Sequence, residues 1–124
     1  MSDHNATVTM YWTSAEARDW VTFGSLLAAD VRYDLPQTRE RIQGRDSYLR
    51  FNREYPSDWH LTVDQVLADG DRAVSRISVT VDGETQPAVT FFDFDDRGRI
   101  AVITDFWPEP YQPPAGREHL VERY

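Results

Sequence analysis

The chain has 124 residues, a usual length for one domain with one core, and 40% of its residues are hydrophobic and 13% aromatic. It contains no cysteine, which excludes disulfide bonds and thiol catalysis. The formal net charge is -8, and all 13 basic residues are scattered arginines. This balance disfavours nucleic-acid binding, and the missing lysine excludes Schiff-base chemistry.

Neither a membrane segment nor a leader is evident. No apolar run approaches the ~20 residues that a membrane-spanning helix needs. The opening residues Met1–Asn5 lack the basic start and apolar stretch of a signal peptide. We therefore expect a cytoplasmic protein that does not bind membranes.

The first half of the chain shows the 3.6-residue spacing of helices. The apolar face of the first expected helix comprises Val8, Tyr11, Trp12 and Ala15. Asp19 is placed to cap a second helix. The apolar face of that second helix would comprise Trp20, Phe23 and Leu27.

Short strands and a third helix follow. Residues 30–36 alternate between apolar and polar side chains and end at Pro36, which predicts a strand, and residues 40–43 predict another. After Gly44, Asp46 is expected to cap the third helix. Its apolar stripe comprises Tyr48, Phe51 and Tyr55.

From Trp59 onwards the apolar period becomes two, which is typical of strands. Four strands are expected at about residues 60–68, 72–81, 85–94 and 99–107. Asp-Gly pairs separate the first three and indicate hairpin turns. Helices followed by an antiparallel meander predict an α+β domain over residues 1–124, with a proline-rich tail at residues 108–124. Residues 108–114 of this tail are expected to run extended along the surface, and one loose helical turn is expected within residues 116–124.

Several local strings, in this order of elements, resemble the nuclear-transport-factor-2-like superfamily of ketosteroid isomerase, SnoaL-like polyketide cyclases and limonene epoxide hydrolase. The strings are Tyr11-Trp12, Ala17–Trp20, Leu27–Val31, Gly44–Asp46 and Asp96–Ile100. The resemblance implies a cone-shaped, curved antiparallel sheet with three N-terminal helices closing an apolar pocket. It is evidence for fold rather than for reaction, since one fold hosts many functions.

The functional residues of these families carry over only in part. The oxyanion tyrosine of ketosteroid isomerase falls on Tyr11, but its base falls on Leu35, and Asp34 reaches that place only with a one-residue slip. The protonated aspartate of that enzyme falls on Thr90. Isomerisation of a steroid enone by that constellation is not expected. The Asp-Arg-Asp arrangement of the epoxide hydrolase cannot be assigned to residues of this chain either, because the strand arginine available for it, Arg76, is expected to point outward.

The resemblance also predicts which face of the sheet lines the pocket. The inward residues would be Ser75, Ile77, Val79, Ala88, Thr90, Phe92, Ile103, Asp105 and Trp107. The opposite face includes the apolar residues Val74, Val89 and Phe91. We expect a second subunit to cover that face, which predicts a homodimer.

Asp105 is the candidate general base. A carboxylate on an apolar wall is desolvated, which raises its pKa and suits it to accept a proton near neutrality. The SnoaL-like cyclases that the chain resembles also use a pocket aspartate for proton abstraction. The alternative is a structural role, in which Asp105 contacts an arginine or a tyrosine hydroxyl at the pocket mouth.

Tyr11 is the second catalytic candidate, because its hydroxyl could polarise a ligand carbonyl. Alternatively it is a core aromatic residue whose hydroxyl bonds to Asn52 or Tyr33. The residues expected to contact substrate are Tyr33, Asn52, Trp59, Thr90, Phe92, Ile103 and Trp107. His60 could shuttle protons but fits a strand end better.

No metal site or cofactor motif is apparent. The acidic run at residues 93–96 lacks the EF-hand spacing, and no phosphate-binding loop or nucleotide fingerprint is present. The sequence therefore leaves two functions open. One is a cofactor-free isomerase, cyclase or dehydratase type of enzyme that acts on a small apolar carbonyl or hydroxyl compound. The other is a ligand-binding or dimerisation module without turnover.

Overall fold

The computed structural model describes residues 3–124. Met1 and Ser2, the first two residues of the segment considered above for a signal peptide, lie outside the described residues. Two helices are followed by two strands and a third helix, and a run of four strands comes after them. The elements are α1 (His4–Glu16), α2 (Trp20–Ser25), β1 (Leu27–Leu35), β2 (Glu40–Gln43), α3 (Arg45–Arg53), β3 (Trp59–Asp69), β4 (Arg72–Val81), β5 (Glu84–Phe94) and β6 (Ile100–Phe106). The expected α+β class is confirmed.

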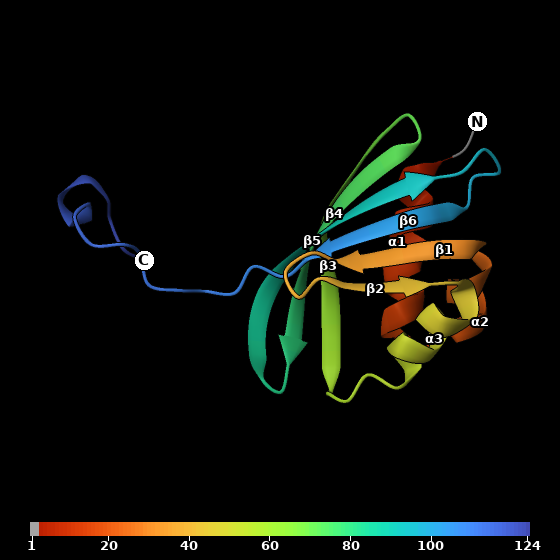
Figure 1. Cartoon of the computed structure of the whole chain (residues 1–124), viewed down its shortest axis with the longest axis horizontal. Helices are drawn as coiled ribbons and strands as arrows, with labels where there is room; N and C mark the ends of the chain where they lie inside the picture. The colour runs from red at the N-terminus through yellow and green to blue at the C-terminus, as the bar shows by residue number, and fades with distance from the viewer. Residues whose placement is uncertain (1–2) are drawn as a thin grey trace.

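One curved sheet has the strand order β2-β1-β6-β5-β4-β3 (Figure 1). Strands β3 to β6 form the expected antiparallel meander. Its turns place Gly70 and Gly83 at φ 61° and 88°, in the left-handed region that glycine tolerates. Strand β1, however, pairs with β6 in parallel, so the sheet is mixed rather than wholly antiparallel. This pairing joins strands that are far apart in the chain, so no local pattern encodes it.

The helices begin and end close to the expected places, with two differences. Asp19 caps α2 by accepting a hydrogen bond from Thr22 N at 3.2 Å, as predicted. Asp46 does not cap α3; Gly44 at φ 94° takes that place, and Asp46 lies in the first turn. Leu27 does not lie on α2, because that helix ends at Ser25 and Leu27 opens β1, where it pairs with Ile100.

The two faces of the sheet differ as the resemblance implied. The helices pack against one face, and the side chains expected to point inward there are buried or, for Trp107, half-buried. The outer face keeps Val74 and Val89 half-buried, Arg76 exposed, and Phe91 and Phe106 42% and 38% exposed. The sheet therefore has an apolar outer face that no element within residues 3–124 covers.

The tail of residues 108–124 projects away from the sheet after β6 (Figure 1). Residues 108–114 are extended, but they leave the domain instead of running along its surface as expected. A turn at residues 115–116 and a single 3-10 turn at Glu118–Leu120 follow, where one helical turn was expected. No helix within residues 3–124 combines the length and apolar character needed to cross a membrane.

Candidate active site

A pocket opens between the helices and the concave face of the sheet. Its volume is about 90 Å³, several times the ~10–15 Å³ that one water needs. Aromatic residues make up much of the wall: Tyr11, Trp12, Phe23, Tyr33, Tyr48, Phe51, Tyr55, Trp59 and Trp107. The other lining residues are aliphatic apart from Asn52 and Asp105. This composition suits an apolar ring compound with one or two polar groups.

Asp105 is the one carboxylate among the residues that line this pocket, and it is 3% exposed. Its Oδ1 accepts a hydrogen bond from Thr90 Oγ1 at 2.7 Å. Its Oδ2 accepts two, from the Tyr33 hydroxyl at 2.6 Å and from Trp107 Nε1 at 2.8 Å. Thr90 is the cross-strand partner of Asp105 on β5, which explains the contact. These three neutral donors hold the carboxylate in place.

The charge of Asp105 has no cationic partner among residues 3–124. Burial raises the pKa of Asp105, and the hydrogen bonds from Tyr33, Thr90 and Trp107 offset part of that rise. Of the two structural contacts weighed from the sequence, the tyrosine hydroxyl is present and the arginine is not. A carboxylate with a raised pKa in an apolar pocket is suited to accept a proton.

A pair of tyrosine hydroxyls forms the second polar feature. The Tyr11 hydroxyl bonds to that of Tyr48 on α3, and not to Asn52 or Tyr33, the two partners that the sequence suggested. Tyr33 stacks on Tyr48 with ring centroids 4.5 Å apart. Burial raises the pKa of Tyr11 and of Tyr48, and the Asp105 charge adds to both shifts. These hydroxyls therefore stay protonated. Within the pair one hydroxyl donates and the other accepts, and the accepting hydroxyl keeps its own proton to donate to a ligand.

The remaining expected contact residues fall into two groups. Tyr33, Asn52, Trp59 and Trp107 line the pocket. Asn52 also donates to the backbone oxygen of Tyr48 at 2.8 Å. Thr90, Phe92 and Ile103 are buried and do not line it. Thr90 acts on the site through Asp105, and Phe92 packs edge-on against Tyr11, with centroids 5.1 Å apart.

Tyr48 is a site residue that sequence reasoning placed only in the apolar stripe of the third helix. Periodicity shows that a side chain faces inward, but it does not show which hydroxyl another helix brings within reach. One signal could have pointed to Tyr48: a tyrosine rather than a phenylalanine stands on the buried stripe, and a buried hydroxyl needs a hydrogen-bond partner.

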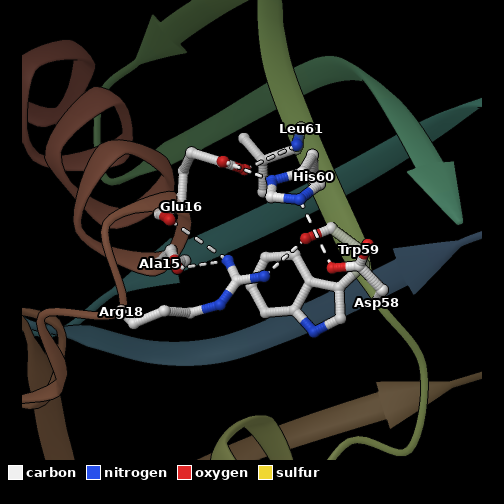
Figure 2. A network of polar contacts seen from close by, with 7 residues as sticks. All are labelled: Ala15, Glu16, Arg18, Asp58, Trp59, His60 and Leu61. Carbon is white, nitrogen blue, oxygen red and sulfur yellow. Dashed lines mark hydrogen bonds and ion pairs between the residues drawn. The ribbon is translucent and has the colours of Figure 1, made fainter.

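Arg18 secures one wall of the pocket from outside (Figure 2). Its guanidinium carbon lies 3.5 Å from the centroid of the Trp59 ring. The same guanidinium donates to the backbone oxygens of Ala15, Glu16 and Trp59. Arg18 itself has φ 59°, the left-handed conformation in which the chain turns out of α1. A single side chain thus ties the end of α1 to the start of β3.

His60 lies beside this contact and outside the pocket (Figure 2). Its Nδ1 is 2.8 Å from Glu16 Oε2 and its Nε2 is 3.3 Å from Asp58 Oδ1. Glu16 also accepts the Leu61 backbone N–H at 2.7 Å. The hydrogen bond to Glu16 raises the pKa of His60. Its place at the strand end is consistent with a structural role.

The comparisons with known proteins agree with this geometry. The fold and pocket define a nuclear-transport-factor-2-like cone, and the SnoaL-like domain model matches residues 8–103. The chain belongs to the SnoaL-like family. No curated protein matches it.

Solved structures show the same fold at very different levels of identity. A Kribbella flavida protein provisionally named a ketosteroid isomerase is 51% identical, with a TM-score of 0.93 over 98% of this chain and 89% of that one. A limonene-epoxide-hydrolase-like enzyme of Mycobacterium tuberculosis is 18% identical, with a TM-score of 0.73 over 85% and 82%. A provisionally named polyketide cyclase of Sinorhizobium meliloti is 23% identical, with a TM-score of 0.71 over 81% and 93%.

Proposed function

We propose that this protein is a cofactor-free acid–base enzyme acting on a small, largely apolar compound that carries a carbonyl or hydroxyl group. Asp105 is the general base and Tyr11 is the donor to the developing oxyanion. The observation that carries the proposal is the buried Asp105 carboxylate, which lines an apolar pocket without a cationic partner among the described residues.

The chemistry is proton abstraction beside a carbonyl. The C–H bond breaks, its proton passes to a carboxylate oxygen of Asp105, and its electron pair spreads onto the carbonyl oxygen as an enolate. The Tyr11 hydroxyl donates to that oxygen, with Tyr48 as its neighbour in the pair. Return of the proton to another carbon is an isomerisation. Attack of the enolate carbon on a second carbonyl is a ring closure.

Asp105 keeps capacity for this proton. A carboxylate has about four lone-pair sites, and the three hydrogen bonds occupy one on Oδ1 and two on Oδ2. One site on Oδ1 remains. The name of the 51% identical Kribbella protein supports carbonyl chemistry. In this chain, however, Leu35 occupies the position of the ketosteroid isomerase base, and Thr90 occupies that of its protonated aspartate. The base that we propose, Asp105, lies on the last strand instead.

The competing function is a ligand-binding or dimerisation module without turnover. A buried aspartate with a purely structural role also needs hydrogen-bond donors, and Asp105 has three of them. This observation favours the module without turnover. The two functions differ in one measurable respect, because only the enzyme labilises a C–H bond.

The test combines binding with hydrogen exchange. Steroid, aromatic polyketide and terpenoid ketones are first screened for a rise in the melting temperature. Ketones that bind are then incubated in D₂O, and deuterium uptake beside the carbonyl is followed by NMR. We expect uptake with the parent and a ~10²–10⁴-fold slower rate with Asp105→Asn. Ketones that bind equally to both proteins but exchange at the same rate would establish the binding module.

We further propose that the protein is a homodimer that pairs the outer faces of two sheets. One row of cross-strand partners on this face comprises Leu67, Val74, Phe91 and Thr104. Phe91 and Phe106 meet edge to face with centroids 6.0 Å apart and are partly exposed. Light scattering at micromolar concentration should give twice the chain mass; a 14.4 kDa species alone would contradict the dimer.

A further inference from the structure

The tail is an extended arm that touches little of its own domain. Four of its residues are prolines, at 108, 110, 113 and 114, which stiffen the chain. The hydrogen bonds of the described tail after residue 107 lie within it: Gly116 N donates to Glu118, and Leu120 N donates to the Arg117 oxygen. None of its residues is fully buried. The domain does not supply a surface for this arm.

The arm nevertheless carries apolar side chains. Tyr111 is 86% exposed, Leu120 is 74% exposed and Val121 is 49% exposed. A solvated linker has few such residues, because exposed apolar area is unfavourable in water and favours association. This composition indicates that the arm packs on another surface.

The arm also keeps its path in a relative. Residues 108–124 are 17 of the 124 in the chain. The superposition on the Kribbella flavida crystal structure covers 98% of this chain with a TM-score of 0.93, which is not reachable if the whole arm follows a different course there. A projecting segment that holds its course in a second protein is not a random coil.

The root of the arm lies at the outer face of the sheet. Phe106, the last residue of β6, belongs to that face and contacts Phe91, and the arm begins two residues later. The arm therefore leaves the domain at the edge of the surface that the proposed dimer buries. In the proposed homodimer, the protein beside that edge is a second copy of the chain.

We propose that the arm is exchanged between subunits: each tail crosses to the second copy and packs Tyr111, Leu120 and Val121 on its apolar surface. This inference rests on the proposed homodimer and adds the segment that fastens it. An exchanged arm increases the buried area without enlarging the domain, and it makes dissociation require release of both arms.

Contact between subunits can be measured directly, because the chain has no cysteine. Ala115→Cys, in the exposed tail, takes a nitroxide label, and the labelled protein is mixed with ¹⁵N-labelled parent. We expect the label to broaden amide signals of the ¹⁵N chains. A label at Val21→Cys on α2, 86% exposed, is the matched control and should broaden few of them.

Broadening that occurs only when label and ¹⁵N share one chain would show the arm folded on its own domain and would overturn the proposal. No broadening in either sample would overturn it as well. A full chain that is monomeric by light scattering would refute the homodimer itself, which is a separate and distinguishable result.

The contribution of the arm to the stability of the dimer is tested with variants of the full chain. The triple variant Tyr111→Ser, Leu120→Ser, Val121→Ser should raise the dimer dissociation constant at least tenfold in sedimentation equilibrium. Val21→Ser, an equally exposed apolar residue on α2, should leave it unchanged. A dimer whose dissociation constant is the same in the triple variant and the parent would contradict the exchange while leaving the dimer intact.

Discussion

At the scale of single residues, Asp105 is held by a strand neighbour, a tyrosine from β1 and a tryptophan two residues along its own strand. None of these donors carries a charge, so the cost of desolvating the carboxylate is only partly offset. The same setting that makes Asp105 a usable base makes it a source of pH-dependent stability.

Asp105→Asn tests that setting without a substrate. The raised pKa means that the native state binds more protons than the unfolded chain between the usual aspartate value and the raised one. Native stability therefore falls as the pH rises through this window, then stays level. Asparagine does not titrate, so the variant should match the parent near pH 4 and equal or exceed it at pH 7. Urea melts at several pH values measure this difference.

The amide also fits the local donors. Its oxygen can take the place of Oδ2 and accept from Tyr33 and Trp107, while its NH₂ group can donate to the Thr90 hydroxyl. A loss of about 3 kcal/mol or more at pH 7 would contradict this account, since a loss of that size is typical of a broken buried ion pair.

At the scale of elements, the junction of α1 with β3 depends on Arg18. Arg18→Ala removes the contact with the Trp59 ring and the three donations to carbonyl oxygens. We expect a stability loss of about 1–2 kcal/mol and a more mobile Trp59. Line width and solvent exchange of the Trp59 indole N–H in ¹⁵N spectra follow the mobility.

Two further variants separate the causes. Arg18→Gly loses the same contacts but tolerates φ 59° without strain, so it should be the more stable of the two Arg18 variants. Arg97→Ala, in the exposed turn between β5 and β6, is the control and should change neither stability nor the indole signal. An unchanged indole signal in Arg18→Ala would show that Trp59 needs no support from outside.

Local patterns were enough to predict most elements, and the family resemblance was needed to predict the inward face of the sheet. The Asp-Gly turns and Asp19 are signals that a few neighbouring residues carry, and the structure has the hairpins and the cap there. The parallel pairing of β1 with β6 and the Tyr11–Tyr48 contact join residues far apart in the chain. Periodicity gives each side chain a face but not a partner, so these features could not be predicted.

At the scale of the whole molecule, charge shapes what the pocket can admit. The pocket mouth adjoins an outer groove whose lining includes Glu40, Asp82, Glu84 and Glu109. The groove and the pocket share Leu35, Phe51, Tyr55 and Trp107 among other residues. With a net charge of -8, the molecule repels anions on their way to Asp105.

Neutral ligands should therefore bind more tightly than anionic ones of the same shape. Naphthaleneacetamide and naphthaleneacetate are a matched pair for calorimetry. We expect the amide to bind at least several-fold more tightly at low salt, and the gap to narrow in 0.5 M NaCl because salt screens the repulsion, with a Debye length of roughly 3–5 Å there. Equal affinities at low salt would show that the acidic groove does not influence entry.

The parallel seam between β1 and β6 has a consequence for how the chain folds. Tyr33 and Asp105 are 72 residues apart, and the seam that brings them together closes only after the last strand has been synthesised. Contacts between such distant segments are slow to form, because the loop entropy must be lost before the contacts repay it. In the sheet β1 lies between β2 and β6, so without β6 it would be paired with β2 alone. A chain that ends before β6 therefore cannot contain the site, since it lacks both the Asp105 carboxylate and the strand that places it beside Tyr33.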